Sequence, residues 1–340
     1  MVRQFVPALV LAFCAAQLCI WLGTPLPWMI GPIFATATAC MLGAPLRAPV
    51  RAREAGQWVI GTTLGLYFSV PVLAVLKTVW PWIALAVAFA LTLGWLGGVL
   101  LQRLSGVERG TAFFAMAVGG AAEMAVQAER HGARVDRVAA AHSLRLMLVV
   151  GAIPFALRAW NAHGADLFVP AATALDPGGL LLLMGVTGIG AVLLKHWHVP
   201  NAWVIGSLLV ALALTAGGIH LSRMPESLVR TGQLLIGVAL GTRFTPDFAR
   251  TAPRYLASVA VCTLAMMGLG AAFGLGIAAL AGIHPGTMVL ATSPGGIAEM
   301  ALTARVLHLG VPVVTAFHVV RMAVVVLTIG PLYRWSARLL

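Results

Sequence analysis

The chain has 340 residues, of which 60% are hydrophobic and 9% are charged, and its mean hydropathy is +0.96. Soluble chains carry roughly 25% charged residues, so the composition excludes a soluble domain of this size. The net charge of +12 does not indicate a nucleic-acid partner, because Lys and Arg lie mainly in short loops between apolar segments and no DNA- or RNA-binding motif is visible. The composition predicts an all-α polytopic membrane protein that has the lipid bilayer as its solvent.

Apolar segments follow one another along the whole chain, six in each half. In the first half they cover residues 5–22, 26–43, 56–76, 79–101, 110–127 and 138–157, and in the second half 178–194, 201–219, 231–243, 255–282, 286–304 and 312–332. A helix needs about 20 residues to cross the ~30 Å hydrocarbon core, and most of these segments approach that length. The first segment follows Arg3 as in a signal peptide, but no clear cleavage site comes after it, so we expect it to be a transmembrane helix.

The two halves are copies of one repeat, related by an offset of 175 to 176 residues. The matching positions include Pro25 with Pro200, Trp28 with Trp203, Gly56-Gln57 with Gly232-Gln233, Gly110-Thr111 with Gly286-Thr287, His142 with His318 and Arg145 with Arg321. One offset that holds over roughly 120 residues is the mark of an internal duplication. The sequence therefore predicts a first membrane repeat at 1–158, a linker at 159–177 and a second membrane repeat at 178–340.

The Lys and Arg residues indicate how many segments cross. If all twelve cross, 11 of these residues lie inside and 9 outside, which is no asymmetry. If the fifth segment of each repeat enters and leaves on one side, 15 lie inside and 5 outside, as the positive-inside rule expects. Five crossings per repeat would invert the second repeat relative to the first. We therefore expect inverted repeats, each with a broken or re-entrant helix, and 10–12 membrane segments. A helix that breaks at the midplane and still crosses is the alternative.

The fifth segment of each repeat carries the same block, Gly-Gly-x-Ala-Glu-Met-Ala. Its candidate site residues are Gly119, Gly120 and Glu123 in the first copy and Gly295, Gly296 and Glu299 in the second. Paired glycines loosen a helix, and a carboxylate is costly to bury in hydrocarbon, so we expect a helix break with an acidic group beside it. A carboxylate there can hold Na⁺ or a proton. Alternatively, each Glu caps its own half-helix or pairs with a nearby Arg.

The last segment of each repeat carries a buried cation. Arg145 and Arg321 lie too deep in these segments to reach the membrane surface easily, and His142 and His318 precede them by three residues on the same helix face. The arginines either bind a substrate carboxylate or phosphate, or pair with the glutamates and hold the fifth and sixth segments together. The histidines either act directly or are hydrogen-bonded core residues.

Other residues carry weaker signals. Gln57 and Gln233 open the third segments, where glycines at small-x-x-x-small spacing predict close helix packing. We interpret the arginines at 47, 51 and 53 as determinants of topology in a loop. Possible polar liners are Asn201, Thr62, Thr63 and Ser293. The four cysteines and nine histidines show no metal-ligand spacing, and there is no P-loop, so we expect no metal, no cofactor and no ATP-driven transport by this chain alone.

The duplicated Gly-Gly-x-x-Glu-Met block, in a chain of this length, resembles the AbrB family of bacterial inner-membrane proteins. The resemblance covers essentially the whole chain and implies a multi-pass protein of the bacterial inner membrane. In organisation the family is similar to the cation/proton antiporter and anion transporter superfamily, whose inverted repeats contain crossed, broken helices. That similarity would put the two Gly-Gly-Glu blocks at the crossing.

Family members have carried the labels ammonia monooxygenase and AbrB-type regulator. An oxygenase needs metal ligands that the sequence lacks, and a transcription factor needs a soluble DNA-reading domain for which there is no room. We therefore predict a secondary transporter, not an enzyme, that moves a small solute such as an organic anion and is coupled to H⁺ or Na⁺. The alternatives are a membrane-embedded ligand sensor that regulates gene expression indirectly and, with less support, a membrane enzyme. Glycine-rich helix faces also permit a homodimer.

Overall fold

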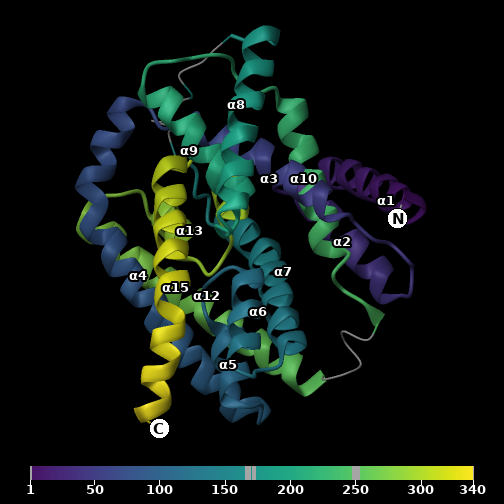
Figure 1. Ribbon diagram of the computed structural model, residues 1–340, viewed down its shortest axis with the longest axis vertical. Coiled ribbons are helices and arrows are strands. Elements are labelled where there is room, and N and C mark those ends of the chain that lie inside the picture. The colour runs from purple at the N-terminus through teal and green to yellow at the C-terminus, as the bar shows by residue number, and fades with distance from the viewer. Residues whose placement is uncertain (1, 165–169, 171–173, 247–252, 340) are drawn as a thin grey trace. The chain divides into compact units, whose positions relative to one another are not determined.

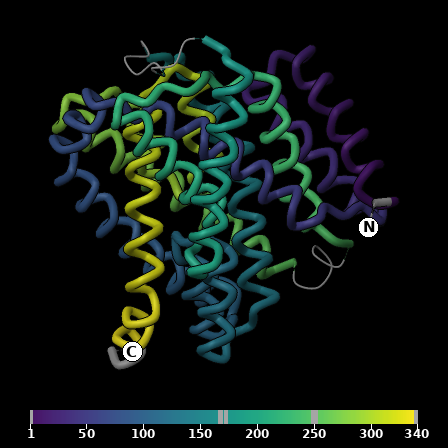
Figure 2. The backbone as a smooth tube through the Cα atoms, turned by 45° about the horizontal axis from the view of Figure 1, so that its top comes forward, coloured from purple at the N-terminus to yellow at the C-terminus, as the bar shows by residue number. Residues whose placement is uncertain are grey.

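The computed structural model describes residues 2–164, 170, 174–246 and 253–339, and every regular element in these ranges is an α-helix (Figure 1). The first repeat contains α1 (Val2–Trp21), α2 (Pro27–Met41), α3 (Val50–Gly65), α4 (Val70–Ser105), α5 (Arg109–Met116), α6 (Ala121–Arg130) and α7 (Val135–Ala159). The second contains α8 (Pro177–His196), α9 (Ala202–Ala216), α10 (Glu226–Gly241), α12 (Pro253–Ala281), α13 (Pro285–Thr292), α14 (Ile297–Val306) and α15 (Val311–Leu339). Figure 2 traces this path from α1 in purple to α15 in yellow. The predicted all-α fold is confirmed.

Length and composition identify the helices that can cross a bilayer. Among the described residues, six helices are long and apolar enough: α1, α4, α7, α8, α12 and α15. The helices α2, α3, α9 and α10 have 15 or 16 residues, so each spans about 22–24 Å, somewhat less than the ~30 Å hydrocarbon core. Large apolar side chains such as Leu181 and Trp21 are 77% and 81% exposed, which suits contact with lipid rather than water. The chain is a multi-pass membrane protein.

The helices form two compact units, and each unit draws on both repeats. Unit 1 consists of Met1–Thr78, Pro154–Asp247 and Ala301–Pro312, and unit 2 of Val79–Ile153, Phe248–Met300 and Val313–Leu340. Unit 1 therefore holds the first three helices of each repeat, and unit 2 holds most of the later segments. The predicted boundaries follow the repeat in the sequence, whereas each compact unit combines segments from both repeats. Much of the predicted linker, at 165–169 and 171–173, lies outside the described residues.

Glycines bring helices of different repeats together in unit 1. A Cβ built on Gly65 of α3 would lie 2.6 Å from the carbonyl oxygen of Leu208 in α9. In the other repeat, a Cβ on Gly241 of α10 would lie 2.5 Å from the carbonyl oxygen of Ile33 in α2. Because a real Cβ cannot come so close to a backbone oxygen, only glycine permits these contacts. The close packing that the small-x-x-x-small spacing predicted is confirmed.

The contact between α3 and α10 joins two equivalent residues. A Cβ on Gly56 would lie 2.7 Å from the carbonyl oxygen of Gly232, and a Cβ on Gly232 would lie 3.3 Å from that of Gly56. When residue i contacts its own counterpart and the neighbouring contacts are reciprocal, the two parts are related by a pseudo-two-fold axis. Gly56 and Gly232 make a reciprocal contact of this kind within unit 1.

Glycines seat the short helices of unit 2 in the same way. A Cβ on Gly98 of α4 would lie 3.1 Å from the Cα of Phe113 in α5. A Cβ on Gly274 of α12 would lie 2.8 Å from the carbonyl oxygen of Met288 in α13. Each long helix thus supports the first half-helix of its own repeat at equivalent positions, so the packing around the two half-helices is similar.

The third segment of each repeat differs from the prediction. It was expected at 56–76, but α3 ends at Gly65 and α4 begins at Val70. Pro71 explains the boundary, because proline is favoured in the first turn of a helix and unfavourable inside one. The start was also wrong, since α3 begins at Val50, so Arg51 and Arg53 lie in its first turn rather than in a loop. The equivalent α10 likewise begins earlier than expected, at Glu226 instead of residue 231.

Candidate functional site

The fifth segment of each repeat is a broken helix, as predicted. In the first repeat α5 ends at Met116 and α6 begins at Ala121, while in the second α13 ends at Thr292 and α14 begins at Ile297. The residues that follow α5 and α13 adopt extended backbone angles, with ψ of 132° and 149°. The chain leaves the first half-helix there and starts a second one four residues later. Each break therefore exposes carbonyl groups at one helix end and N–H groups at the other.

The first broken helix folds back on itself. The backbone N–H of Arg134, just after α6, donates to Oγ1 of Thr111 at the start of α5 over 3.0 Å. A Cβ built on Gly110 would lie 3.4 Å from the Cβ of Ala133. A straight helix over residues 109–130 would separate these ends by about 33 Å. The segment 109–134 is therefore a hairpin that begins and ends at one place.

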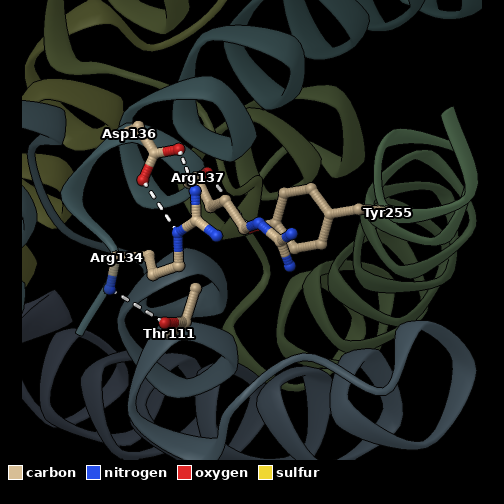
Figure 3. A network of polar contacts seen from close by, with 5 residues as sticks. All are labelled: Thr111, Arg134, Asp136, Arg137 and Tyr255. Carbon is tan, nitrogen blue, oxygen red and sulfur yellow. Dashed lines mark hydrogen bonds and ion pairs between the residues drawn. The ribbon is translucent and has the colours of Figure 1, made fainter. Parts of the chain in front are cut away.

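Polar contacts close the base of this hairpin (Figure 3). Arg134 also forms an ion pair with Asp136 at 3.0 Å, and Asp136 raises the pKa of the Arg134 guanidinium chiefly by accepting its hydrogen bonds. The hydroxyl of Tyr255 in α12 donates to the carbonyl of Arg137 over 3.0 Å. The Arg137 guanidinium lies 5.5 Å from the centre of the Tyr255 ring. The ion pair thus joins the end of the hairpin to the start of α7, and Tyr255 joins the start of α7 to α12.

The double glycines lie against side chains of their own block and have ordinary backbone angles. Neither pair has a positive φ. A Cβ on Gly119 would lie 2.8 Å from Cε of Met124, and one on Gly295 would lie 2.7 Å from Cγ of Met300. In both copies the first glycine therefore makes room for the methionine of the same block. Both glycine pairs lie in the helix breaks, and their first members also leave space for these methionines.

The second glycine of each pair makes room for the glutamate. A Cβ on Gly120 would overlap with Oε2 of Glu123, and a Cβ on Gly296 would overlap with Oε2 of Glu299. Each glutamate is the third residue of its half-helix, so its carboxylate folds back over the helix N-terminus, as in a capping box. The negative charge there is favoured by the helix dipole. Glu299 is 8% exposed, whereas Glu123 is partly exposed.

The buried arginines bind the other side of each break. Arg145 donates from Nη1 to the carbonyl of Ala117 over 2.9 Å and from Nη2 to that of Gly119 over 3.3 Å. Its counterpart in the second repeat does the same: the Arg321 guanidinium donates to two carbonyls, each over 2.6 Å, those of Ser293 and Gly295. Both arginines thereby satisfy carbonyl groups that the helix break leaves without intrahelical partners.

Each arginine is in turn held by its histidine. Nη2 of Arg145 lies 2.8 Å from Nδ1 of His142, and Nη2 of Arg321 lies 2.9 Å from Nδ1 of His318. A guanidinium can only donate, so both Nδ1 atoms accept and the proton of each ring is on Nε2. Nε2 then donates over 2.9 Å to the carbonyl of the preceding half-helix, at Phe114 or at its counterpart. Both histidines are therefore neutral core residues that link the last segment to the broken one.

The predicted site residues thus lie in one compact unit, at two equivalent breaks. Arg145 and Arg321 donate to backbone carbonyls and histidines, and within the described residues Glu123 forms no ion pair. At each break the arginine stands at the carbonyl end of one half-helix and the glutamate at the N–H end of the next. Each charge is accordingly matched to a helix dipole.

The remaining polar candidates are mostly in unit 1. Nε2 of Gln57 donates to Oδ1 of Asn201 over 3.4 Å, and the hydroxyls of Thr62 and Thr63 donate to carbonyls of their own helix. Gln233 is 4% exposed. Of the predicted polar liners, only Ser293 belongs to a helix break, where its carbonyl accepts from an arginine.

A family model described as "Transition state regulatory protein AbrB" matches residues 28–337. The chain belongs to the AbrB family. This confirms the resemblance that rested on the duplicated block. The AbrB-family chain is 28% identical over 339 residues to "Uncharacterized protein YhjN" from Bacillus subtilis (strain 168), covering 92% of this chain and 88% of that protein. It is 26% identical over 312 residues to "Putative regulator AbrB" from Escherichia coli (strain K12), covering 90% and 88%. No solved structure matches it.

Several residues at the breaks of this AbrB-family protein were not predicted from its sequence. The methionines at 124 and 300 belong to the repeated block, but their residue type gives no sign of a role there. Thr111, which closes the hairpin, was visible only as half of a repeated Gly-Thr pair. The carbonyl groups that accept from the arginines could not be predicted, because every residue has a backbone carbonyl.

Proposed function

We propose that this AbrB-family protein is a secondary transporter that moves a small solute across the bacterial inner membrane by alternating access, coupled to H⁺ or Na⁺. One observation carries the proposal: two equivalent helix breaks lie in the same compact unit, and each has an arginine at its carbonyl end and a glutamate at its N–H end. Discontinuous helices of this kind form substrate and ion sites near the midplane of secondary transporters.

The chemistry of the breaks supports this role. A carboxylate in an apolar setting can exchange a proton or coordinate Na⁺, and its occupancy changes the charge at the end of a half-helix. Glu123 and Glu299 are therefore the groups we assign to the coupling ion. The arginines stabilise each break by donating to its carbonyl groups. A solute could then bind to the N–H groups at the start of the second half-helix without unfolding either half-helix.

The path of the chain supports inverted repeats. With α5 and α6 as a re-entrant hairpin, the first repeat has five segments left to cross, namely α1, α2, α3, α4 and α7. An odd number of crossings begins the second repeat on the opposite side of the membrane. The Lys and Arg distribution favours the same topology. Two inverted halves give the inward-open and outward-open states similar energies, which alternating access requires.

Flux through proteoliposomes tests the proposal. Purified protein is reconstituted, and uptake of a panel of radiolabelled metabolites is measured with and without a pH or Na⁺ gradient. Glu123→Gln and Glu299→Gln should abolish gradient-driven uptake, because neither amide can exchange a proton at neutral pH. Glu129→Gln serves as the matched control, since Glu129 lies on the same half-helix as Glu123 but is exposed at its far end. Equal uptake by all three variants would remove the glutamates from the coupling mechanism.

Regulation of gene expression by ligand sensing is the second candidate. The family model and the Escherichia coli relative both carry regulator names, and this favours a regulatory role. A membrane-embedded sensor would bind its ligand at the same breaks and act on transcription indirectly. Absence of flux for every solute, together with a ligand that raises the melting temperature of the protein, would support the sensor and overturn the transporter.

The glycine-rich helix faces would also allow two molecules to pack together as a homodimer.

A further inference from the structure

The two arginines at the breaks have donor capacity that the protein does not use. A guanidinium carries five N–H groups. In Arg145 and in Arg321, Nη1 and Nη2 donate to two carbonyls and one histidine, which accounts for three of them. The Nε–H group of each arginine has no acceptor among the described residues. Both repeats leave the same atom without a partner.

These Nε–H groups are buried. Arg145 is 3% exposed and Arg321 is 7% exposed, and within the described ranges no other arginine is buried. Burying a charged donor without an acceptor is costly, so such a group calls for a bound water or ligand. Arg53 in unit 1 also has an Nε without a partner, but its side chain is partly exposed and it does not belong to a helix break.

The two donors favour a negatively charged ligand. Arg145 and Arg321 belong to the same unit, and each brings a buried positive charge to it. The histidines that contact them are neutral, as their hydrogen bonds require, so they neither cancel nor add to this positive charge. The other groups that accept hydrogen bonds from each guanidinium are backbone carbonyls, which would repel an anion. The Nε–H group is therefore the donor that each arginine has left for an anion.

We infer that the solute of the proposed transporter is a small organic anion whose carboxylate oxygens accept hydrogen bonds from Nε of Arg145 and Nε of Arg321. The inference rests on the proposed function in so far as it takes the transported solute to be the ligand of this site. A carboxylate is the matching group because it only accepts hydrogen bonds. Charge-assisted bonds from guanidinium to carboxylate are also among the strongest in proteins.

Binding can be measured without transport. The protein is labelled with ¹⁵N-arginine, and its Nε–Hε resonances are recorded in detergent while mono- and dicarboxylates are added. The resonances of the two buried arginines are assigned as those missing in Arg145→Lys and in Arg321→Lys. A carboxylate should shift these two resonances and leave those of exposed arginines unchanged. The corresponding neutral amides should shift neither, and a response to the amides equal to that of the carboxylates would overturn the inference.

The lysine variants add a quantitative test. Lysine keeps the positive charge and can still donate to the break carbonyls, but it lacks Nε–H. Each variant should weaken carboxylate binding on the order of tenfold, the effect of one lost hydrogen bond to a charged group. Arg130→Lys, an exposed position at the end of α6, is the matched control and should bind as wild type does. If a variant does not fold, the resonances of the buried arginines are identified in the wild-type protein by the slow exchange of their Nε–H protons with solvent, and the titration still decides.

Failure of this inference and failure of the transporter proposal give different results. Carboxylate binding at the two Nε–H groups without flux of any carboxylate would keep the anion site and overturn transport. Gradient-driven flux of a neutral or cationic solute, with no response at either Nε–H group to any carboxylate, would keep transport and overturn the anion site. Sulfate or phosphate that shifts both resonances while carboxylates do not would likewise overturn the assignment to organic acids.

Discussion

Arg321 donates a hydrogen bond to the carbonyl oxygen of Gly295 over 2.6 Å, across the interruption between α13 and α14. The equivalent bond joins Arg145 to Gly119 in the other repeat. A buried guanidinium would ordinarily need a counter-ion, but here the carbonyl end of a half-helix supplies the negative potential. Each helix break is therefore stabilised by one buried arginine.

Removing this cation should destabilise the protein. Arg321→Ala leaves two carbonyls and a histidine without their donor, so we expect the free energy of unfolding to fall by about 3 kcal/mol or more. Arg145→Ala should act similarly. Unfolding of the purified protein in mixed micelles measures the change. Arg130→Ala at an exposed position should change stability by less than about 0.5 kcal/mol. A loss of the same small size in Arg321→Ala would mean that the arginine does not hold the break.

The second glycine and the glutamate should behave as a coupled pair. Gly296→Ala places a methyl group where the Glu299 carboxylate lies, so we expect a loss of about 1–3 kcal/mol in the free energy of unfolding. Adding Glu299→Ala should recover part of that loss, which a double-mutant cycle measures. Gly268→Ala in α12 is the control, because its Cβ would meet no atom within 4 Å. Strict additivity of the two substitutions would contradict the packing described above.

A disulfide can report on the re-entrant hairpin. In a background without the four native cysteines, Gly110→Cys and Ala133→Cys should form a disulfide on mild oxidation, because the two Cβ positions are 3.4 Å apart, close to disulfide geometry. Mass spectrometry of the digested protein detects the bond. The pair Ala121→Cys and Ala133→Cys should not form one, since these residues are separated by the length of α6. Equal cross-linking of both pairs would indicate a mobile segment instead of a fixed hairpin.

Labelling from each side of the membrane tests the inversion. Gly132 and His308 occupy equivalent exposed turns after the second half-helices of the two repeats. Single cysteines at 132 and 308 should react with a membrane-impermeant maleimide from opposite sides of oriented vesicles. Labelling of both positions from the same side would exclude inverted repeats. Labelling after permeabilisation confirms that each cysteine is reactive.

Much of the fold could be predicted because the two repeats can be compared with each other. Equivalent Gly, Glu, His and Arg residues marked the two breaks and the helices that hold them, and composition alone indicated membrane helices. Segment boundaries were harder to predict. Apolar runs merge across short turns, so the end of α3 at Gly65 was missed in an apolar stretch that continues into α4.

The partners of the charged groups could not be read from residue types. Opposite charges at matching positions suggested that Glu123 pairs with Arg145, but the arginine binds the main chain instead. Backbone acceptors are present at every position, so only the three-dimensional path of the chain determines which of them a side chain reaches. The compact units could not be predicted from residue types either. Each unit contains helices of both repeats, and this depends on contacts between segments that are distant in the sequence.

The contact of Gly56 with Gly232 makes the two repeats depend on each other. The two glycines occupy equivalent positions of the duplicated sequence, and each lies against its own counterpart. A chain with one repeat alone would need a second molecule to make this contact. In this protein the second copy is covalently attached, so the contact forms within one chain whatever the protein concentration.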